Sequence, residues 1–217
     1  MADSLIDLTT GRFSPKQVAG QVYAGSSGYG ALRVAFIDQE RAELTRAGRR
    51  FKLGYTAAPT GIAPVTAIPT TAAQWTIFNA STTDTYTFEE LGVHLYSGTA
   101  AAGVVVVACF FTLPVQSGFA TGIAAQSCSA SQNKASSAAV KSGVTITTPA
   151  APAWFHVAKS DSANTGVGAV MAVNDQLKGA LMLPPLTGLG VATLSGAGTS
   201  PLYVPVATWT EGAQDLE

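Results

Sequence analysis

Short runs of apolar and β-branched residues, separated by turn residues, occupy most of the chain. Residues 85–96 alternate between apolar and polar positions over most of their length, which is the period-two pattern of a strand with one buried face. Residues 104–113 are apolar without alternation, and this pattern favours a strand that is covered on both faces. The hydrophobic pattern therefore predicts a β-rich protein.

Further runs predict strands by the same criteria. They are residues 74–79, 140–147, 154–158, 167–173, 179–183, 188–195 and 202–209. The Gly- and Ser-rich residues 195–201 predict a hairpin loop between the last two runs. Residues 118–137 are rich in Ala and Ser, and we expect them to be irregular. Many short strands with turns between them are typical of sandwiches and jelly rolls, so the predicted fold class is mainly β, a jelly-roll-like β-sandwich.

The N-terminal part of the chain has no sustained helical or strand period. Local patterns there predict strands at residues 32–37 and 51–55. Between them, residues 38–46 predict a short helix with Asp38 as its N-cap. We expect this part to be an extended arm with small local elements.

Charge divides the chain at about the same place. Eight of the twelve Lys and Arg residues lie in the first 52 positions with five acids, giving +3, and the remainder of the chain carries −4. Pro59, Pro64 and Pro69 keep the segment after this point extended, because proline fixes φ and cannot continue a helix. We therefore predict an extended N-terminal arm over residues 1–55 and a β-sandwich domain over residues 56–217.

The chain is unusually poor in charge. Only 12% of its residues are Asp, Glu, Lys or Arg, which is about half the usual share. A free monomer with so few charges has little electrostatic repulsion to keep it in solution. The composition therefore favours a permanent oligomer that buries surface; the alternative is a monomer kept soluble by Ser and Thr hydroxyls.

The N-terminal residues contain no basic segment followed by an apolar core, and the longest apolar run is strand-sized. We therefore expect no signal peptide, no membrane partner and synthesis in the cytoplasm. The two cysteines do not make a disulfide framework. Cys109 lies inside an apolar run, so we expect it to be a buried, inert thiol.

No motif that carries catalysis or binds a cofactor emerges. His94 and His156 each lack a second ligand at the spacing that a metal site needs. Glu89 and Glu90 are adjacent in a predicted strand, so we expect them on opposite faces, where they cannot act as a catalytic pair. Asn79 begins a glycosylation sequon, which we interpret as coincidence without a secretory signal. The sequence predicts no enzyme, no cofactor and no metal.

Basic residues of the N-terminal part are the candidates for partner binding. They are Arg33, Arg41, Arg46, Arg49, Arg50 and Lys52. A net charge of +3 is too weak for binding driven by nucleic-acid phosphates, so we expect no nucleic acid and interpret these residues as solvated or paired with acidic groups of a protein.

Three stretches resemble virion proteins of tailed phages. They are residues 74–83 (QWTIFNASTT), 91–100 (LGVHLYSGTA) and, in style, 189–205. The resemblance covers most of residues 56–211 and contains no diagnostic motif, so no functional residue is carried over. It implies a bacteriophage structural protein on the capsid surface, synthesised in the host cytoplasm.

Within that family the resemblance implies a head decoration (cement) protein. Such proteins are often trimers of β-sandwich or jelly-roll subunits with an arm that reaches across the capsid. The expected partners are the major capsid protein and further copies of the chain in a homotrimer. The alternative is a receptor- or carbohydrate-binding spike or fibre protein, for which Trp75, Trp154 and Trp209 are candidate sugar-stacking residues. All three lie in predicted strands, where packing in the core is the favoured role of a tryptophan.

Overall fold

The computed structural model describes most of the chain after residue 36. The described residues are 24–26, 32–34, 37–58, 61–100, 102–112, 122–130, 134–163, 171–195 and 199–213. Contacts divide the chain into two compact units, residues 1–44 and 45–217. In the N-terminal part, the short strands β1 (Ala24–Ser26) and β2 (Leu32–Val34) pair antiparallel, and the helix α1 spans Ile37–Arg46.

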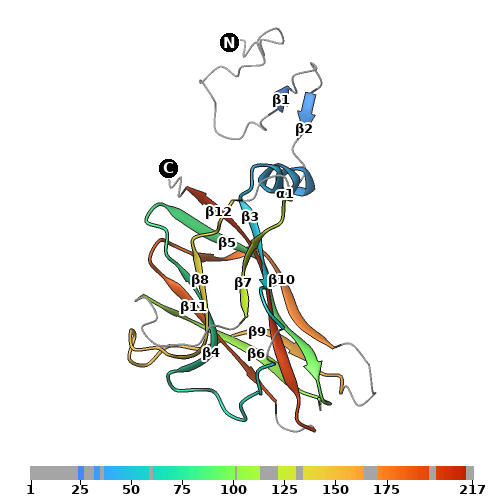
Figure 1. The fold of residues 1–217 in the computed structure, drawn as a ribbon, viewed down its shortest axis with the longest axis vertical. Coiled ribbons are helices and arrows are strands. Elements are labelled where there is room, and N and C mark those ends of the chain that lie inside the picture. The colour runs from blue at the N-terminus through green and yellow to red at the C-terminus, as the bar shows by residue number, and fades with distance from the viewer. Residues whose placement is uncertain are drawn as a thin grey trace, which may run out of the picture. The chain divides into compact units, whose positions relative to one another are not determined.

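The second unit consists of two antiparallel sheets of five strands each (Figure 1). The first sheet has the order β10-β5-β12-β3-β7, with β10 Ala172–Leu183, β5 Asp84–Ser97, β12 Leu202–Ala213, β3 Arg50–Tyr55 and β7 Ile123–Ser127. The second sheet has the order β8-β4-β11-β6-β9, with β8 Ala138–Thr145, β4 Ala72–Asn79, β11 Gly188–Leu194, β6 Val104–Phe111 and β9 Phe155–Ser160.

The strand order is that of a jelly roll. Four antiparallel pairs, β3 with β12, β4 with β11, β5 with β10 and β6 with β9, are nested inside one another along the chain. The pairs alternate between the two sheets, as in one long hairpin wrapped around the core. β7 and β8 lie between the two halves of this hairpin and add one edge strand to each sheet. The predicted fold class is confirmed.

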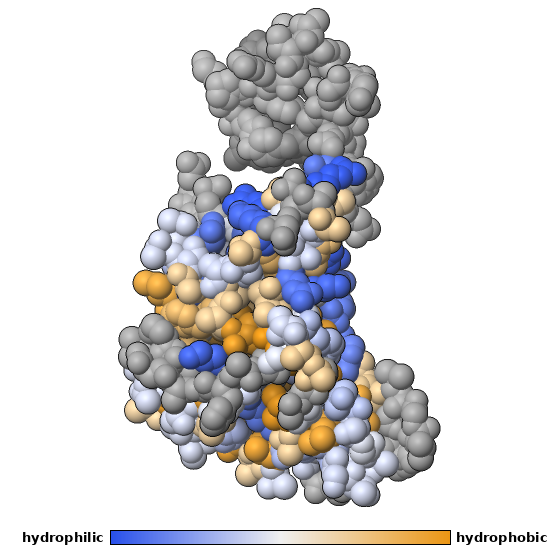
Figure 2. Space-filling view, viewed as in Figure 1, coloured by the Kyte–Doolittle hydropathy of each residue, from blue (hydrophilic) through white to orange (hydrophobic). Residues whose placement is uncertain are grey.

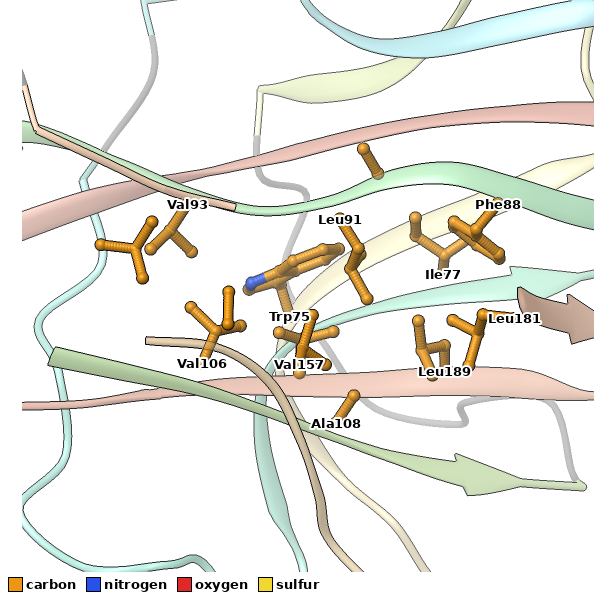
Figure 3. Close-up of a cluster of buried hydrophobic side chains, with 14 of the residues drawn as sticks. Trp75, Ile77, Phe88, Leu91, Val93, Val106, Ala108, Val157, Leu181 and Leu189 are labelled. Carbon is orange, nitrogen blue, oxygen red and sulfur yellow. The ribbon is translucent and has the colours of Figure 1, made fainter. Parts of the chain in front are cut away.

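Apolar side chains from the inner faces of both sheets form the core. Figure 3 shows Trp75 and Leu189 from the second sheet packed toward Leu91 and Val93 from the first. All four are at most 1% exposed. Complete burial of such side chains stabilises the fold by about 1.5–3 kcal/mol each.

The connection from β8 to β9 covers the outer face of the second sheet. These two strands are at opposite edges of that sheet, so residues 146–154 must cross it. Ile146 and Trp154 pack there on Cys109 and Phe111. β6 is therefore covered on both faces, as its unbroken apolar run predicts.

Two predictions for local structure were wrong. β7 lies in the Ala- and Ser-rich segment that we expected to be irregular. The predicted runs 167–173 and 179–183 contribute to one strand, β10, although residues 167–170 lie outside the described residues. The pairing of β10 with β5 shifts between Gln176 and Leu181, which explains why the sequence pattern appeared interrupted.

The expected domain boundary after residue 55 does not match the structure. β3 is hydrogen-bonded between β12 and β7, and Phe51 is completely buried in the core. The segment therefore belongs to the sandwich, because its alternate side chains complete the inner face of the first sheet. Most of residues 1–44 lie outside the described residues, and the extended arm stays a prediction.

Gly92 should not tolerate a side chain. A β-carbon there would overlap the carbonyl oxygen of Val173 and the Cα atom of Asn174 on the neighbouring strand. We expect Gly92→Ala to lower the free energy of unfolding by about 2–3 kcal/mol in chemical denaturation. Gly212→Ala, in the same sheet, is the control, because the nearest atom to its β-carbon would be 3.8 Å away. Equal stabilities of the two variants would contradict this account.

Candidate functional site

The structure distributes the six predicted basic residues over several elements. Arg33 lies on β2, Arg41 and Arg46 on α1, Arg49 before β3, and Arg50 and Lys52 on β3. Arg33 and Arg41 belong to the first unit and the other four to the second. The structure therefore divides the set between the two units and places its last two members, Arg50 and Lys52, on one strand of the sandwich.

Arg50 is engaged within the chain. Its guanidinium lies 2.7 Å from a carboxylate oxygen of Glu89, on β5. The Glu89 side chain is only 10% exposed and that of Arg50 is 29% exposed. A carboxylate so far removed from water needs a cation to compensate its lost hydration, so Arg50 neutralises Glu89.

We expected the side chains of Glu89 and Glu90 on opposite faces of the sheet, and the structure does not place them there. The residues on either side of them, Phe88 and Leu91, are both completely buried, and the pairing of β5 with β12 shifts at this point. A β-bulge thus breaks the period-two rule, and the prediction of opposite faces was wrong. Glu90 accepts hydrogen bonds from the side chains of Asn174 and Thr208.

A second buried carboxylate lies near the end of β12. Glu211 is 7% exposed and accepts a hydrogen bond of 3.1 Å from the indole N–H of Trp209 and another from the hydroxyl of Ser136. Beside it, the hydroxyls of Tyr86 and Ser137 lie 2.6 Å apart, and burial raises the pKa of Tyr86 above its usual value. These contacts tie the segment before β8 to the first sheet. The contacts of Ser136 and Ser137 could not be predicted from the sequence, because their partners Glu211 and Tyr86 are far away along the chain.

The histidines are not brought into a common site. His94 lies on β5 of the first sheet and His156 on β9 of the second. Within the described ranges, no three His, Cys, Asp or Glu residues gather in a way that could hold a metal ion. No helix among these residues is long and apolar enough to cross a membrane.

The three tryptophans serve packing. Trp75 and Trp209 are 1% and 0% exposed, and Trp154 packs against the apolar cluster on the outer face of the second sheet. Core packing was the alternative to sugar stacking in the sequence, and the structure favours it. The aromatic side chains most exposed among the described residues are instead Tyr55 and Tyr96, at 51% and 52%.

Asn79, the residue of the glycosylation sequon, is completely buried. Its side-chain amide donates to three main-chain carbonyl oxygens, those of Asp84 (2.8 Å), Leu183 (3.0 Å) and Pro184 (3.1 Å). An amide engaged in this way is closed to modification in the folded chain. Its role is to connect the turn after β4 with the turn after β10.

Comparison of the chain with models of protein families, with curated proteins and with solved structures finds no match. Function must therefore be inferred from the surfaces and contacts of the chain itself.

Arg50 should contribute to stability through Glu89. We expect Arg50→Met to lower the free energy of unfolding by about 1–3 kcal/mol, because it removes a cation that lies 2.7 Å from a mostly buried carboxylate. Partial exposure of Arg50 keeps the expected loss below that of a fully buried pair. Lys52→Met, an exposed neighbour on the same strand, should change stability by less than about 0.5 kcal/mol. Urea titration of both variants checks this, and similar losses in both would contradict it.

The two thiols should differ in reactivity. Cys109 is completely buried, and burial raises its pKa to about 12. At pH 8 only roughly one part in ten thousand of this thiol is ionised, and the thiolate is the reactive form. We expect an aromatic disulfide reagent to titrate at most one thiol in the native protein and both after unfolding. In Cys128→Ser no thiol should react before unfolding; a fast-reacting thiol in that variant would refute the burial of Cys109.

Proposed function

We propose that the chain is a structural protein of a virus particle, a decoration or cement protein that binds the capsid lattice of a tailed phage as an oligomer. On this proposal it is not an enzyme, and its work is done by surfaces. Its partners are the major capsid protein and further copies of itself.

The fold supports the proposal at the level of analogy. Jelly rolls of this strand order recur in viral capsid proteins and in lectins. A fold by itself does not determine a function, so the properties of the surface have to distinguish between these two kinds of protein.

The sparsely charged surface of the sandwich is the observation that carries the proposal. Residues 56–217 contain four basic and eight acidic residues. Figure 2 shows weakly polar and apolar residues over much of the visible face. The ion pair of Arg50 with Glu89, whose side chains are 29% and 10% exposed, removes further charge from the surface. Such a surface is suited to being covered by protein.

The places where the chain enters and leaves the sandwich support an arm that acts together with the sandwich. Arg50, at the start of β3, pairs with Thr210, near the end of β12. The chain therefore enters and leaves the sandwich at the same end. Segments that leave from one end can engage one partner while the rest of the sandwich contacts its neighbours.

The alternative function is that of a receptor- or carbohydrate-binding spike or fibre protein. The exposed rings of Tyr55 and Tyr96 are the features that favour it, since aromatic faces stack on sugars. A glycan-array signal that is lost in Tyr55→Ala or Tyr96→Ala would support this alternative over the decoration protein.

Removal of residues 1–44 should abolish binding to the capsid and leave the sandwich folded. Cosedimentation with purified heads of the virus that encodes the chain measures binding, and circular dichroism monitors the fold. The deletion stops before Thr45, where the second compact unit begins, so β3 is kept. The proposal fails if the full-length chain does not bind heads; the role of the arm fails if the truncated chain binds them equally well.

A further inference from the structure

We propose that copies of this chain associate head to tail, with the turn that carries Leu186 on one copy inserted into an uncharged groove on the next. The inference deepens the proposed function, because it rests on copies of the chain associating, and it names the two surfaces through which they do so.

Leu186 has a backbone conformation that leucine rarely adopts. The N–H of Thr187 donates to the carbonyl oxygen of Pro184 (3.3 Å), which closes a turn whose third residue, Leu186, has a φ of +59°. Glycine or asparagine is favoured at such a position, because a β-carbon is strained in the left-handed region. The Leu186 side chain is nevertheless 50% exposed. The strained backbone is thus not compensated by full burial of the Leu186 side chain within the chain, and this favours a contact of that side chain outside it.

The surroundings hold this leucine rigidly. The turn 184–187 lies beside the turn 80–83, and we call the two turns together the Leu186 tip. Asn79 connects them: its side chain donates to the carbonyl oxygens of three residues around them, and its carbonyl oxygen accepts the N–H of Leu186 (3.0 Å). Neither turn contains a charged residue, and the carboxylate of Asp84, which follows the second turn, accepts a hydrogen bond from the hydroxyl of Ser81 (3.4 Å). A tip held rigidly in this way loses little conformational entropy on docking.

A groove of about 430 Å³ lies at the other end of β4. Residues of the segment 61–69, the start of β4 and β8 line it, and none of the lining residues is charged. Ile62, Val65 and Ala72 supply apolar surface. The side chain of Gln74 is already bonded to the main chain, because it donates to Ala63 and accepts from the N–H of Thr193 (2.6 Å). The groove is therefore suited to an apolar guest.

The tip and the groove cannot meet within one chain. Asn79, which holds the tip, is the last residue of β4, and Ala72, which lines the groove, is the first. Seven steps along a strand separate them by about 23 Å. A knob and a pocket at different places on one surface make a heterologous contact, which closes into a ring when the rotation between copies allows it. Closure after three copies gives the expected homotrimer.

The native mass of the full-length chain, measured by analytical ultracentrifugation over a range of concentrations, tests this inference. We expect the wild type to reach three times the monomer mass. Leu186→Gly and Leu186→Asn remove the knob and suit the left-handed backbone, so both should be folded monomers by circular dichroism. Ala72→Phe fills the groove and should also be monomeric.

Ser200→Gly is the matched control. Ser200 is exposed, has a φ of +46° and does not line the groove, so this variant relaxes the backbone in the same way without touching either surface. It should keep the wild-type mass.

An equimolar mixture of Leu186→Gly and Ala72→Phe gives the sharpest readout. One variant keeps its groove and the other its knob, so we expect complexes of twice the monomer mass and no larger. A monomeric wild type, an unchanged mass in the Leu186 variants, unfolding of both Leu186 variants, or a mixture that stays monomeric would overturn the inference. Trimers that do not bind heads would count against the proposed function alone. Monomers that coat heads would overturn this inference and the oligomeric part of the proposed function, and would leave binding to the capsid intact.

Discussion

Contact between the inner faces of the two sheets is the constraint on which the rest of the structure depends. The ring of Trp209 lies 6.0–6.3 Å, between centroids, from those of Phe51, Tyr86 and Phe88. Trp75 fills the facing position from the second sheet. A slip of one residue in any of these strands would turn its large side chain to the outside, so burial determines the register. The placement of every group on the outer faces follows from that register.

The outer faces of the two sheets differ in what lies on them. The second sheet is covered by residues 146–154, and its glycines permit this close approach: a β-carbon on Gly190 would lie 2.7 Å from Ile146 and 3.2 Å from the sulfur of Cys109. The first sheet instead presents Arg50 with Glu89, and Glu90 with Asn174 and Thr208. The charged groups Arg50, Glu89 and Glu90 are thus engaged with partners on the same sheet. The chain thus limits the free charge that it shows to solvent without burying both faces.

The fold class could be predicted from the sequence, because alternation and unbroken apolar runs report directly on burial. β7 could not, since Ala and Ser have weak preferences and the strand is defined by its pairing with β3. The bulge at Glu89 and the ion pair with Arg50 depend on register between distant segments, which no local pattern contains. The six basic residues show the same limit. Their clustering is visible in the sequence, but the ion pair that Arg50 forms with Glu89 is not.

The backbone of Leu186 is informative because left-handed positions elsewhere in the described chain are mostly occupied by glycine. Six described glycines, among them Gly98 and Gly179, occupy left-handed positions, whereas the described non-glycine residues there are Lys178, Leu186 and Ser200. Lys178, at the irregularity within β10, and Ser200, before β12, cost strain, but both are exposed and their side chains interact well with water. Leucine has no such compensation, and a glycine would relieve the strain without disturbing the Asn79 hydrogen bonds. A large apolar side chain at this place is therefore the feature that favours a contact outside the chain. The groove at the start of β4, whose lining carries no charge, is the surface that the proposed contact uses.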